Sequence, residues 1–291
     1  MLLSLTWWTP PASAGELGIT DDLGRQVRLN GPAKRVICLY GGLTETVAAL
    51  GCQDLLVART KADDHPAEVA ALPSIGTHMR PNLELVAALA PDLVLQQAGR
   101  DEALAVAQDI EDLGIPVALF HPESFEDLFS VMLRVGTLLN ADDQAQGLVT
   151  GLRQRLDQVD QALDGITDRP GVVFEIRYPN LLVAGQASMI TEIMHRAGAT
   201  NPVAKESKLV RLSEEELLRL DPDAYLVQHG PMNPSPLPPE DRPLFKDLQA
   251  VRSGRVLVVE EALFSRPGPR SVQAVEQLAR FLHAERFTDK Q

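Results

Sequence analysis

Aromatic residues, cysteines and long apolar runs are all scarce in this sequence. Phe, Trp and Tyr make up only 4% of the 291 residues, which leaves few rings to stack on a flat ligand. With only two cysteines, no disulfide framework is expected to hold the fold together. No run of eighteen apolar residues occurs, so the pattern predicts no membrane-spanning helix. The remaining composition, 45% hydrophobic and 23% charged, is typical of a globular chain long enough for two domains.

Positive charge is also in short supply. The chain has 27 Lys and Arg residues against 40 Asp and Glu residues, which gives a net charge of −13. Nucleic acid and an anionic membrane surface would both repel such a protein. We therefore expect no nucleic-acid partner.

The sequence lacks the motifs of several enzyme classes. No Gly-x-Gly-x-x-Gly follows a strand, and neither a P-loop, a Gly-x-Ser-x-Gly nor a His-Glu-x-x-His is present. We expect no catalytic residues and no catalytic cofactor. A metal-dependent enzyme built on the same fold stays an alternative, and tight stoichiometric binding without turnover would separate a receptor from it.

The N-terminal residues 1–14 resemble a signal peptide that has lost its start. Leu2 to Trp8 form a short apolar stretch, and Ala12-Ser13-Ala14 has the small-x-small pattern of a cleavage site. The basic start of a signal is missing, since Arg25 is the first basic residue. We interpret this segment as a truncated signal peptide that directs a soluble protein to the periplasm. A disordered tail is the alternative.

Cys38 and Cys52 are the two cysteines. Cys38 lies in the most apolar strand pattern of the chain and is expected to be a small buried side chain. A helix is predicted between the two, which disfavours a disulfide without excluding it. Neither cysteine is placed for a bacterial lipid anchor.

Two stretches of the chain nearly repeat each other. Residues 82–95 and 213–227 each contain an acidic amphipathic helix, then Pro-Asp, then a buried apolar run. Pro91 and Pro222 end the helices, and the apolar run after each fits a strand covered on both faces. Because the unit occurs once in each half, we predict two lobes of similar build with a shared cleft.

Alternating apolar and amphipathic segments predict the elements of both lobes. In the first half we expect strands at Arg35–Leu39, Leu55–Ala58, Leu93–Gln96 and Val117–Phe120, and helices at Leu43–Leu50, Asn82–Leu89, Glu102–Leu113 and Phe125–Leu139. In the second half we expect strands near Gly171–Ile176, Leu181–Ala184, Tyr225–Gln228 and Arg255–Val259, and a closing helix at Ser271–Ala284. Such alternation predicts an α/β fold with parallel sheets.

The two lobes are expected to be joined by one rigid helix. Residues 141–163 are rich in Gln, Asp, Leu and Arg, and they lack the Ser and Pro of a flexible linker. The predicted division is therefore an N-terminal lobe at 15–139, a linker helix at 140–165 and a C-terminal lobe at 166–291. Each lobe is expected to be Rossmann-like.

Several short motifs, taken in order, resemble one family of proteins. They are Asp21-x-x-Gly24-Arg25, Arg35-Val36-Ile37 leading into Thr44-Glu45, the 82–95 unit, Leu182-Val183-Ala184-Gly185, Arg255-Val256-Leu257, and Phe264-Ser265-Arg266-Pro267-Gly268-Pro269-Arg270. Together they span roughly residues 18 to 285. They resemble the solute-binding proteins of bacterial ABC importers for vitamin B12, ferric siderophores and haem. The resemblance implies two lobes joined by a long helix and a monomeric transport receptor.

The resemblance also implies a partner. In this family a glutamate on each lobe docks onto arginines of the permease dimer, and by position these are Glu84 and Glu215. Two carboxylates on equivalent helices would steer docking and fix its register. Glu214 and Glu216 flank the second candidate, so its identity stays open. The alternative is that both glutamates are simply solvated helix faces.

Ligand-binding side chains are expected on loops at the strand ends that face the other lobe. The candidates are Tyr40, His78, Met79, Arg177, Tyr178, His229, Met232 and Arg266. The segments around Met79 and His229 resemble those that carry the axial ligands of staphylococcal-type haem receptors. That resemblance implies that these two side chains ligate haem iron from opposite lobes.

The cargo itself stays open on the sequence. Haem, another tetrapyrrole or a ferric siderophore is favoured, and cobalamin is the alternative within the same family. Arg177, Arg266 and Arg270 suit either a siderophore anion or haem propionates, so they do not discriminate. A bare metal ion held by Asp63, Asp64, His65 and His78 is a further alternative, although the spacing is not diagnostic.

Overall fold

A computed structural model describes residues 17–287, so the signal-peptide prediction for residues 1–14 lies outside the described residues. Within residues 17–287, no helix has the length and apolar character needed to cross a bilayer. The elements of the N-terminal lobe are β1 (Leu17–Thr20), β2 (Gln26–Leu29), β3 (Val36–Cys38), α1 (Gly41–Ala49), η1 (Gln53–Leu55), β4 (Leu56–Ala58), η2 (Ala67–Ala71), β5 (Gly76–Thr77), β6 (Arg80–Pro81), α2 (Leu83–Ala88), β7 (Leu93–Gln97), α3 (Asp101–Glu111), β8 (Val117–Phe120) and α4 (Phe125–Leu139).

The N-terminal lobe is built on a four-stranded sheet in the order β4-β3-β7-β8, in which every pair is parallel. Its strands are almost wholly buried, as expected when helices cover both faces. One face packs against α1 and α4, and the other packs against α2 and α3. The short β1–β2 hairpin is antiparallel and lies on α4.

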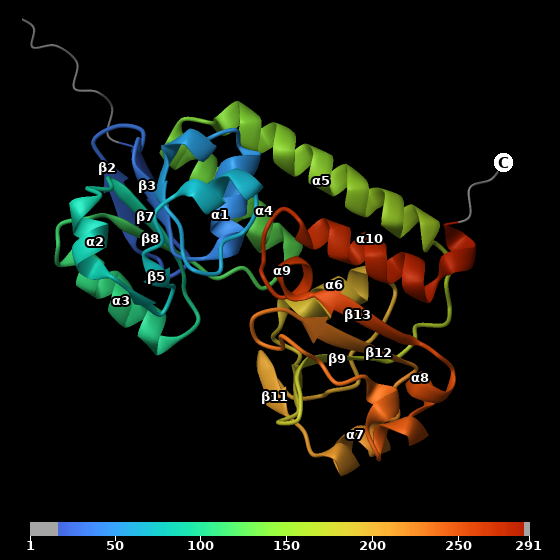
Figure 1. Ribbon diagram of the computed structural model, residues 1–291. Coiled ribbons are helices and arrows are strands. Elements are labelled where there is room, and N and C mark those ends of the chain that lie inside the picture. The colour runs from blue at the N-terminus through green and yellow to red at the C-terminus, as the bar shows by residue number, and fades with distance from the viewer. Residues whose placement is uncertain (1–16, 288–291) are drawn as a thin grey trace, which may run out of the picture.

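A single helix connects the lobes. This helix, α5 (Asp142–Ala162), contains 21 residues. The C-terminal lobe then contains β9 (Val172–Arg177), β10 (Leu182–Ala184), α6 (Met189–Arg196), β11 (Leu209–Arg211), α7 (Glu214–Leu220), β12 (Ala224–His229), η3 (Pro239–Asp241), η4 (Phe245–Asp247), α8 (Gln249–Arg252), β13 (Val256–Glu260), α9 (Glu261–Phe264), α10 (Ser271–Leu282) and η5 (Ala284–Arg286). Figure 1 shows α5 running beside α10, with α7 on the far side of the C-terminal sheet.

The sheet of the C-terminal lobe is mixed, which corrects the prediction of parallel sheets in both lobes. Its order is β11-β10-β9-β12-β13. The strands β9, β12 and β13 are parallel, whereas β10 and β11 are antiparallel to their neighbours. Four residues separate β9 from β10, which is too short for the crossover that a parallel neighbour needs. The second strand must therefore reverse.

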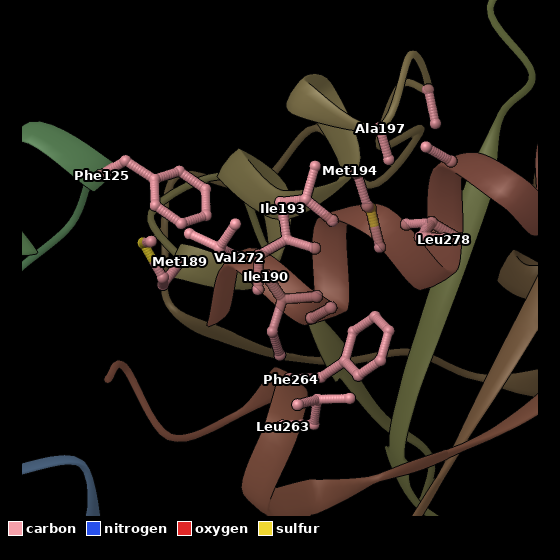
Figure 2. Packing of buried hydrophobic residues seen from close by; sticks show 14 of the residues in the cluster. Phe125, Met189, Ile190, Ile193, Met194, Ala197, Leu263, Phe264, Val272 and Leu278 are labelled. Carbon is pink, nitrogen blue, oxygen red and sulfur yellow. The ribbon is translucent and has the colours of Figure 1, made fainter. Parts of the chain in front are cut away.

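One of the hydrophobic clusters contains residues of both lobes. Phe125 and Phe129 of α4 belong to the same buried cluster as Met189 of α6 and Val272 of α10. Figure 2 shows Phe125 pointing from its helix toward Met189 and Val272. The other face of α4 packs into the core of the N-terminal lobe. The two lobes are therefore packed against each other and are not joined by a linker alone.

The C-terminal lobe has a second hydrophobic cluster, around Tyr225 and Phe245, and a buried ion pair lies beside it. Glu175 accepts hydrogen bonds from Arg242 and from the Tyr225 hydroxyl, the latter at 2.7 Å. The guanidinium of Arg242 also donates to the backbone oxygen of Leu237. Burial raises the pKa of the Tyr225 hydroxyl, with the Glu175 charge as the next cause. The pair therefore fastens the proline-rich loop, residues 230–239, to the sheet.

Candidate functional site

The carboxyl ends of the N-terminal strands bring Tyr40, Gln97 and Arg100 to one edge of the sheet. Cys38 pairs with Leu95. Tyr40 follows the end of β3, Gln97 is the last residue of β7, and Arg100 follows it. The Tyr40 ring meets the His78 ring edge to face, with the ring centroids 6.1 Å apart. His78 is held in place because its backbone oxygen accepts a hydrogen bond from Gln96 Nε2 at 3.1 Å. Two predicted site residues are thus brought together.

The protonation of these two rings is set by their surroundings. Burial raises the pKa of the Tyr40 hydroxyl, which keeps it protonated and able to donate. Burial also lowers the pKa of His78, and the positive charge of Arg100 adds to this effect. At neutral pH this favours a neutral imidazole, which is the form that can ligate a metal.

The carboxyl edge of the C-terminal sheet carries a second row of polar side chains. His229 pairs with Glu260, and Val227 pairs with Glu175, so Arg177 stands two residues further along beside His229. His229 is exposed, and Arg177 is half-buried. The buried Nε of Arg177 has no hydrogen-bond partner among the described residues. Met232, in the loop after β12, is also exposed.

Residues 261–270, which we name the interlobe segment, join the two edges. The Tyr40 hydroxyl donates to the backbone oxygen of Ser265 at 3.1 Å. Gln228 Nε2 and the Met232 backbone N–H both donate to Glu261, at 3.0 and 2.8 Å. The side chain of Ser265 bonds to Gln228. One continuous network therefore runs from the Tyr40 edge to the loop of Met232.

The two arginines of the interlobe segment hold the lobes together. Arg270 donates to both carboxylate oxygens of Glu45 in α1, at 2.6 and 2.9 Å. Arg266 is buried, donates to the backbone oxygen of Ala62 at 3.0 Å, and lies 3.8 Å from Glu261. Both guanidinium groups thus have protein partners. The predicted role of Arg266 in ligand binding stays a prediction, and its observed contacts are structural.

Close backbone approach explains the glycines at the start of α1. A Cβ on Gly42 would lie 1.8 Å from the backbone oxygen of Pro267, so a side chain there would push the interlobe segment away. Asp63 lies beside Gly41 and accepts from Thr44 and from the backbone of Thr60. Its other oxygen, Oδ1, is buried and has no hydrogen-bond partner in the described part of the chain.

The proposed iron ligands lie on different lobes. Met79 is half-buried in the turn between β5 and β6, and His229 is exposed at the end of β12. Their joint ligation of iron stays a prediction. Across residues 17–287, no group of three or more His, Cys, Asp or Glu side chains is placed to hold a metal ion. The described residues therefore give no support to a bare-metal cluster around Asp63.

Tyr178 is tied to the body of its own lobe. Its hydroxyl donates to Glu214 at 2.8 Å, and the Arg242 guanidinium lies 4.0 Å from its ring centroid. Glu214 is the first cause of the raised pKa of Tyr178. In this arrangement the side chain positions the start of α7. A role in contacting cargo stays a prediction.

The docking candidates occupy matching positions on α2 and α7. Asn82 and Ser213 are the N-cap residues, and Glu84 and Glu215 stand two residues after them. Both glutamates are exposed. Glu214 is bonded to Tyr178, whereas Glu216 accepts from the Ser213 backbone at 2.8 Å. Of the three neighbouring glutamates, Glu215 is thus the one left open to solvent, which sharpens the prediction without testing it.

Several residues of the site were not predicted from the sequence. Gln228 and Glu261 belong to the interlobe network, and Arg100 follows the strand that carries Gln97. A signal was present for Gln228, because a polar residue inside an otherwise apolar strand needs a buried partner. Exposed cations on loops carry no comparable signal. Both cysteines are free thiols, so the disulfide that the sequence left open is not formed.

Comparisons with known proteins agree with this architecture. A family profile described as "Periplasmic binding protein" matches residues 36–263. The uncharacterized ABC transporter substrate-binding lipoprotein YvrC of Bacillus subtilis is 28% identical over 276 residues, covering 93% of this chain and 87% of that protein. The vitamin B12-binding protein of Photorhabdus laumondii is 26% identical over 250 residues, covering 86% and 88%.

A solved structure also superposes on most of the chain. The periplasmic heme-binding protein RhuT from Roseiflexus sp. RS-1, in its apo form, aligns with a TM-score of 0.77 at 25% identity. The alignment covers 87% of this chain and 99% of that protein.

Proposed function

The chain belongs to the periplasmic binding protein family of ABC importers, a family of transport receptors and not of enzymes, and from this premise we propose that it carries a metal chelate to its importer. The observation that supports the proposal most is the meeting of the two carboxyl edges. Tyr40, which contacts His78 on one lobe, bonds to Ser265 of the interlobe segment, and Ser265 bonds to Gln228, the residue before His229 on the other lobe. Ligands of α/β sheets bind at such carboxyl edges.

Within this class, an iron chelate is our first candidate for the cargo. Haem, another tetrapyrrole and a ferric siderophore share a metal centre and a polar periphery, and a similar structure is that of a heme-binding protein. The thioether of Met79 and the imidazole of His229 together would suit electron-rich haem iron. The lowered pKa of His78 favours a neutral imidazole beside the Tyr40 ring.

Cobalamin is the second candidate. It is favoured by the vitamin B12-binding relative, whose similarity extends over 86% of this chain. The low aromatic content weighs against it, because few rings are available to pack on a corrin.

Export to the periplasm and docking on a permease dimer complete the proposal. Glu84 and Glu215 are the proposed contacts, and the chain is proposed to act as a monomer without chemistry of its own. The relative YvrC is described as a lipoprotein. Here Cys38 is buried in β3 and cannot serve as an anchor while the lobe is folded.

Titration with coloured chelates tests the proposal. Purified protein is mixed with haemin, cobalamin or a ferric siderophore, and the visible spectrum is recorded. We expect stoichiometric saturation by one chelate; with haemin, a low-spin Soret band should weaken in both Met79→Ala and His229→Ala. His195→Ala, an exposed histidine on α6, is the matched control and should leave the band unchanged. Absence of saturable binding for every chelate would contradict the function.

A further inference from the structure

A short turn at the end of β12 displays two of the predicted ligand-binding side chains. We name residues 229–233 the cargo turn. His229 and Met232 are both exposed there, so an imidazole and a thioether are open to solvent at the carboxyl edge of the C-terminal sheet. Both groups bind metal ions in proteins. Their positions depend on what holds the backbone of the turn.

The cargo turn is closed by hydrogen bonds of its own. The backbones of Gly230 and Asn233 exchange two bonds, at 2.9 and 3.2 Å. The buried side chain of Asn233 donates to the backbone oxygen of Gln228 at 3.0 Å. The backbone N–H of Met232 takes no part in these bonds and donates instead to the Glu261 carboxylate at 2.8 Å.

Glu261, the first residue of the interlobe segment, is a buried carboxylate with partners on two sides. Its Oε2 accepts from the Met232 N–H and from Gln228 Nε2 at 3.0 Å. Its Oε1 lies 3.8 Å from Nη2 of Arg266, and Nη1 of Arg266 donates to the backbone oxygen of Ala62 in the N-terminal lobe at 3.0 Å. A buried carboxylate is costly unless such partners compensate its charge. The cargo turn is therefore linked to the N-terminal lobe through this one side chain.

Close packing leaves no space between the cargo turn and Glu261. A Cβ on Gly230 would lie 2.4 Å from the Glu261 Cβ and 2.9 Å from its Oε2, distances that side-chain carbons do not adopt. Glycine therefore lets the backbone beside His229 lie directly on the glutamate. A larger residue at this position would displace the cargo turn or α9.

We propose that Glu261 is a positioning residue for the cargo, because it holds His229 and Met232 in a fixed place relative to the other lobe. This rests on the proposed function. A loose turn would have to be ordered when the cargo binds, and that ordering costs affinity. A carboxylate bonded to the backbone N–H orders the turn beforehand. Glu261 acts through the cargo turn and not by touching the cargo.

Substitutions on both sides of this contact test the role. Glu261→Ala removes the acceptor, whereas Glu261→Gln keeps an amide oxygen that can accept both hydrogen bonds. Gly230→Ala displaces the cargo turn and leaves the carboxylate in place. Glu260→Gln removes one charge from the neighbouring, exposed glutamate and is the matched control.

Two measurements are made on each variant. Hydrogen exchange reports the protection of the Met232 amide in the protein without cargo. Haemin, cobalamin and ferric citrate are then titrated while the visible spectrum is recorded. In Glu261→Ala and Gly230→Ala we expect the protection to be lost. The affinity for the chelate that saturates the wild type should fall about tenfold, the scale of ordering two side chains on binding.

The absorption band of the bound chelate, recorded at saturation, separates positioning from a purely structural role. It should change in Glu261→Ala and Gly230→Ala, because the side chains of the cargo turn no longer meet the chelate in the same geometry. Lower stability alone would leave this band unchanged. Glu261→Gln and Glu260→Gln should match the wild type in the protection of the amide, the affinity and the band.

The outcomes separate this role from the function beneath it. Losses in Glu261→Ala and Gly230→Ala, with recovery in Glu261→Gln, support it; if Glu261→Ala does not fold, Gly230→Ala and Glu261→Gln decide in the same way. Wild-type affinity and spectrum in Glu261→Ala overturn it and leave the receptor function standing. An equal loss in Glu260→Gln also overturns it, because charge and not position would then be the cause. Failure of every chelate to bind the wild type overturns both.

Discussion

The two repeated units, residues 82–95 and 213–227, have the same backbone plan in both lobes. Each begins at a capped helix, with Asn82 accepting from Leu85 and Ser213 accepting from Glu216. Each helix is followed by a residue with left-handed φ, Ala90 at 45° and Asp221 at 36°. A Pro-Asp pair and a buried parallel strand come next.

The aspartate after each proline does the same work in both lobes. Asp92 accepts from the backbone N–H of Lys34 and Arg35, immediately before β3. Asp223 accepts from the N–H of Gly171 at 2.7 Å, immediately before β9. In each case the carboxylate fixes the start of the neighbouring parallel strand. The repeat is therefore a device for setting strand register.

The lobes differ in what lies beside this shared device. The strand β3 is wholly apolar, whereas β9 carries Glu175, buried with Arg242. The neighbour of β3 on its outer side is parallel, and that of β9 is antiparallel. The repeated unit therefore fixes the register of the central strands in both sheets, whereas the outer strands differ between the lobes.

Arg242→Met breaks the feature found only in the C-terminal lobe and has the largest expected effect. It leaves Glu175 buried without its partner, which should lower the free energy of unfolding by about 3–5 kcal/mol. Urea denaturation followed by circular dichroism measures it. The double variant Glu175→Leu/Arg242→Met removes the stranded charge and should recover part of the loss. A cost below about 1 kcal/mol for the single variant would contradict the account.

Asp92→Ala and Asp223→Ala test whether the two aspartates are equivalent. Each loses hydrogen bonds to a charged acceptor, so each should cost about 2 kcal/mol of unfolding free energy. Asp92→Asn and Asp223→Asn keep one acceptor oxygen and should cost less. If only one of the two alanine variants loses unfolding free energy, the two units are alike in sequence but their aspartates do not have the same structural role.

The stability contributed by the cap of α7 should depend on pH, whereas that contributed by the cap of α2 should not. A hydrogen bond from the Ser213 backbone lowers the pKa of Glu216. The contribution of Glu216 to the free energy of unfolding is therefore fully present above the ordinary glutamate pKa, and it is lost as the pH falls through the lowered pKa. The destabilisation by Glu216→Gln should therefore be seen at pH 7 and fade below about pH 4. Asn82→Ala, at the cap without a carboxylate, should cost about 1 kcal/mol at both pH values. Thermal melting at both pH values measures this.

Glu84→Ala and Glu215→Ala should have the smallest effect on the fold. Both side chains are exposed, so each change should alter the unfolding free energy by less than about 0.5 kcal/mol. Ligand affinity should be kept, while uptake by cells carrying the importer should fall sharply in the double variant. Glu240→Ala is an exposed control in the same lobe as Glu215. Unchanged uptake in the double variant would remove the docking assignment.

Much of the fold was predictable from local sequence pattern. The predicted strand Val117–Phe120 and helix Phe125–Leu139 match β8 and α4 in their bounds, and the long connecting helix was expected. These elements have clear periodicity and clear stop signals. Short β11 was missed, because three residues are too few to show a period.

The site was less predictable. The sequence indicated Tyr40 and His78, which the structure brings into contact, and the buried bond between Gln228 and Glu261 was not foreseen. Tyr178 was expected to contact the ligand, and this stays a prediction; its bond to Glu214 at the start of α7 was not foreseen. Partners of polar side chains depend on residues far along the chain, which no local pattern records.

By itself the sequence determined the alternation of helix and strand, the repeated unit and the exposed glutamates, because periodicity, proline and capping residues act over a few positions. Only the tertiary structure decided that Arg266 and Arg270 bind the lobes to each other. The physical reason is that charge pairing depends on distances between atoms, and those are set when the two sheets meet through the interlobe segment.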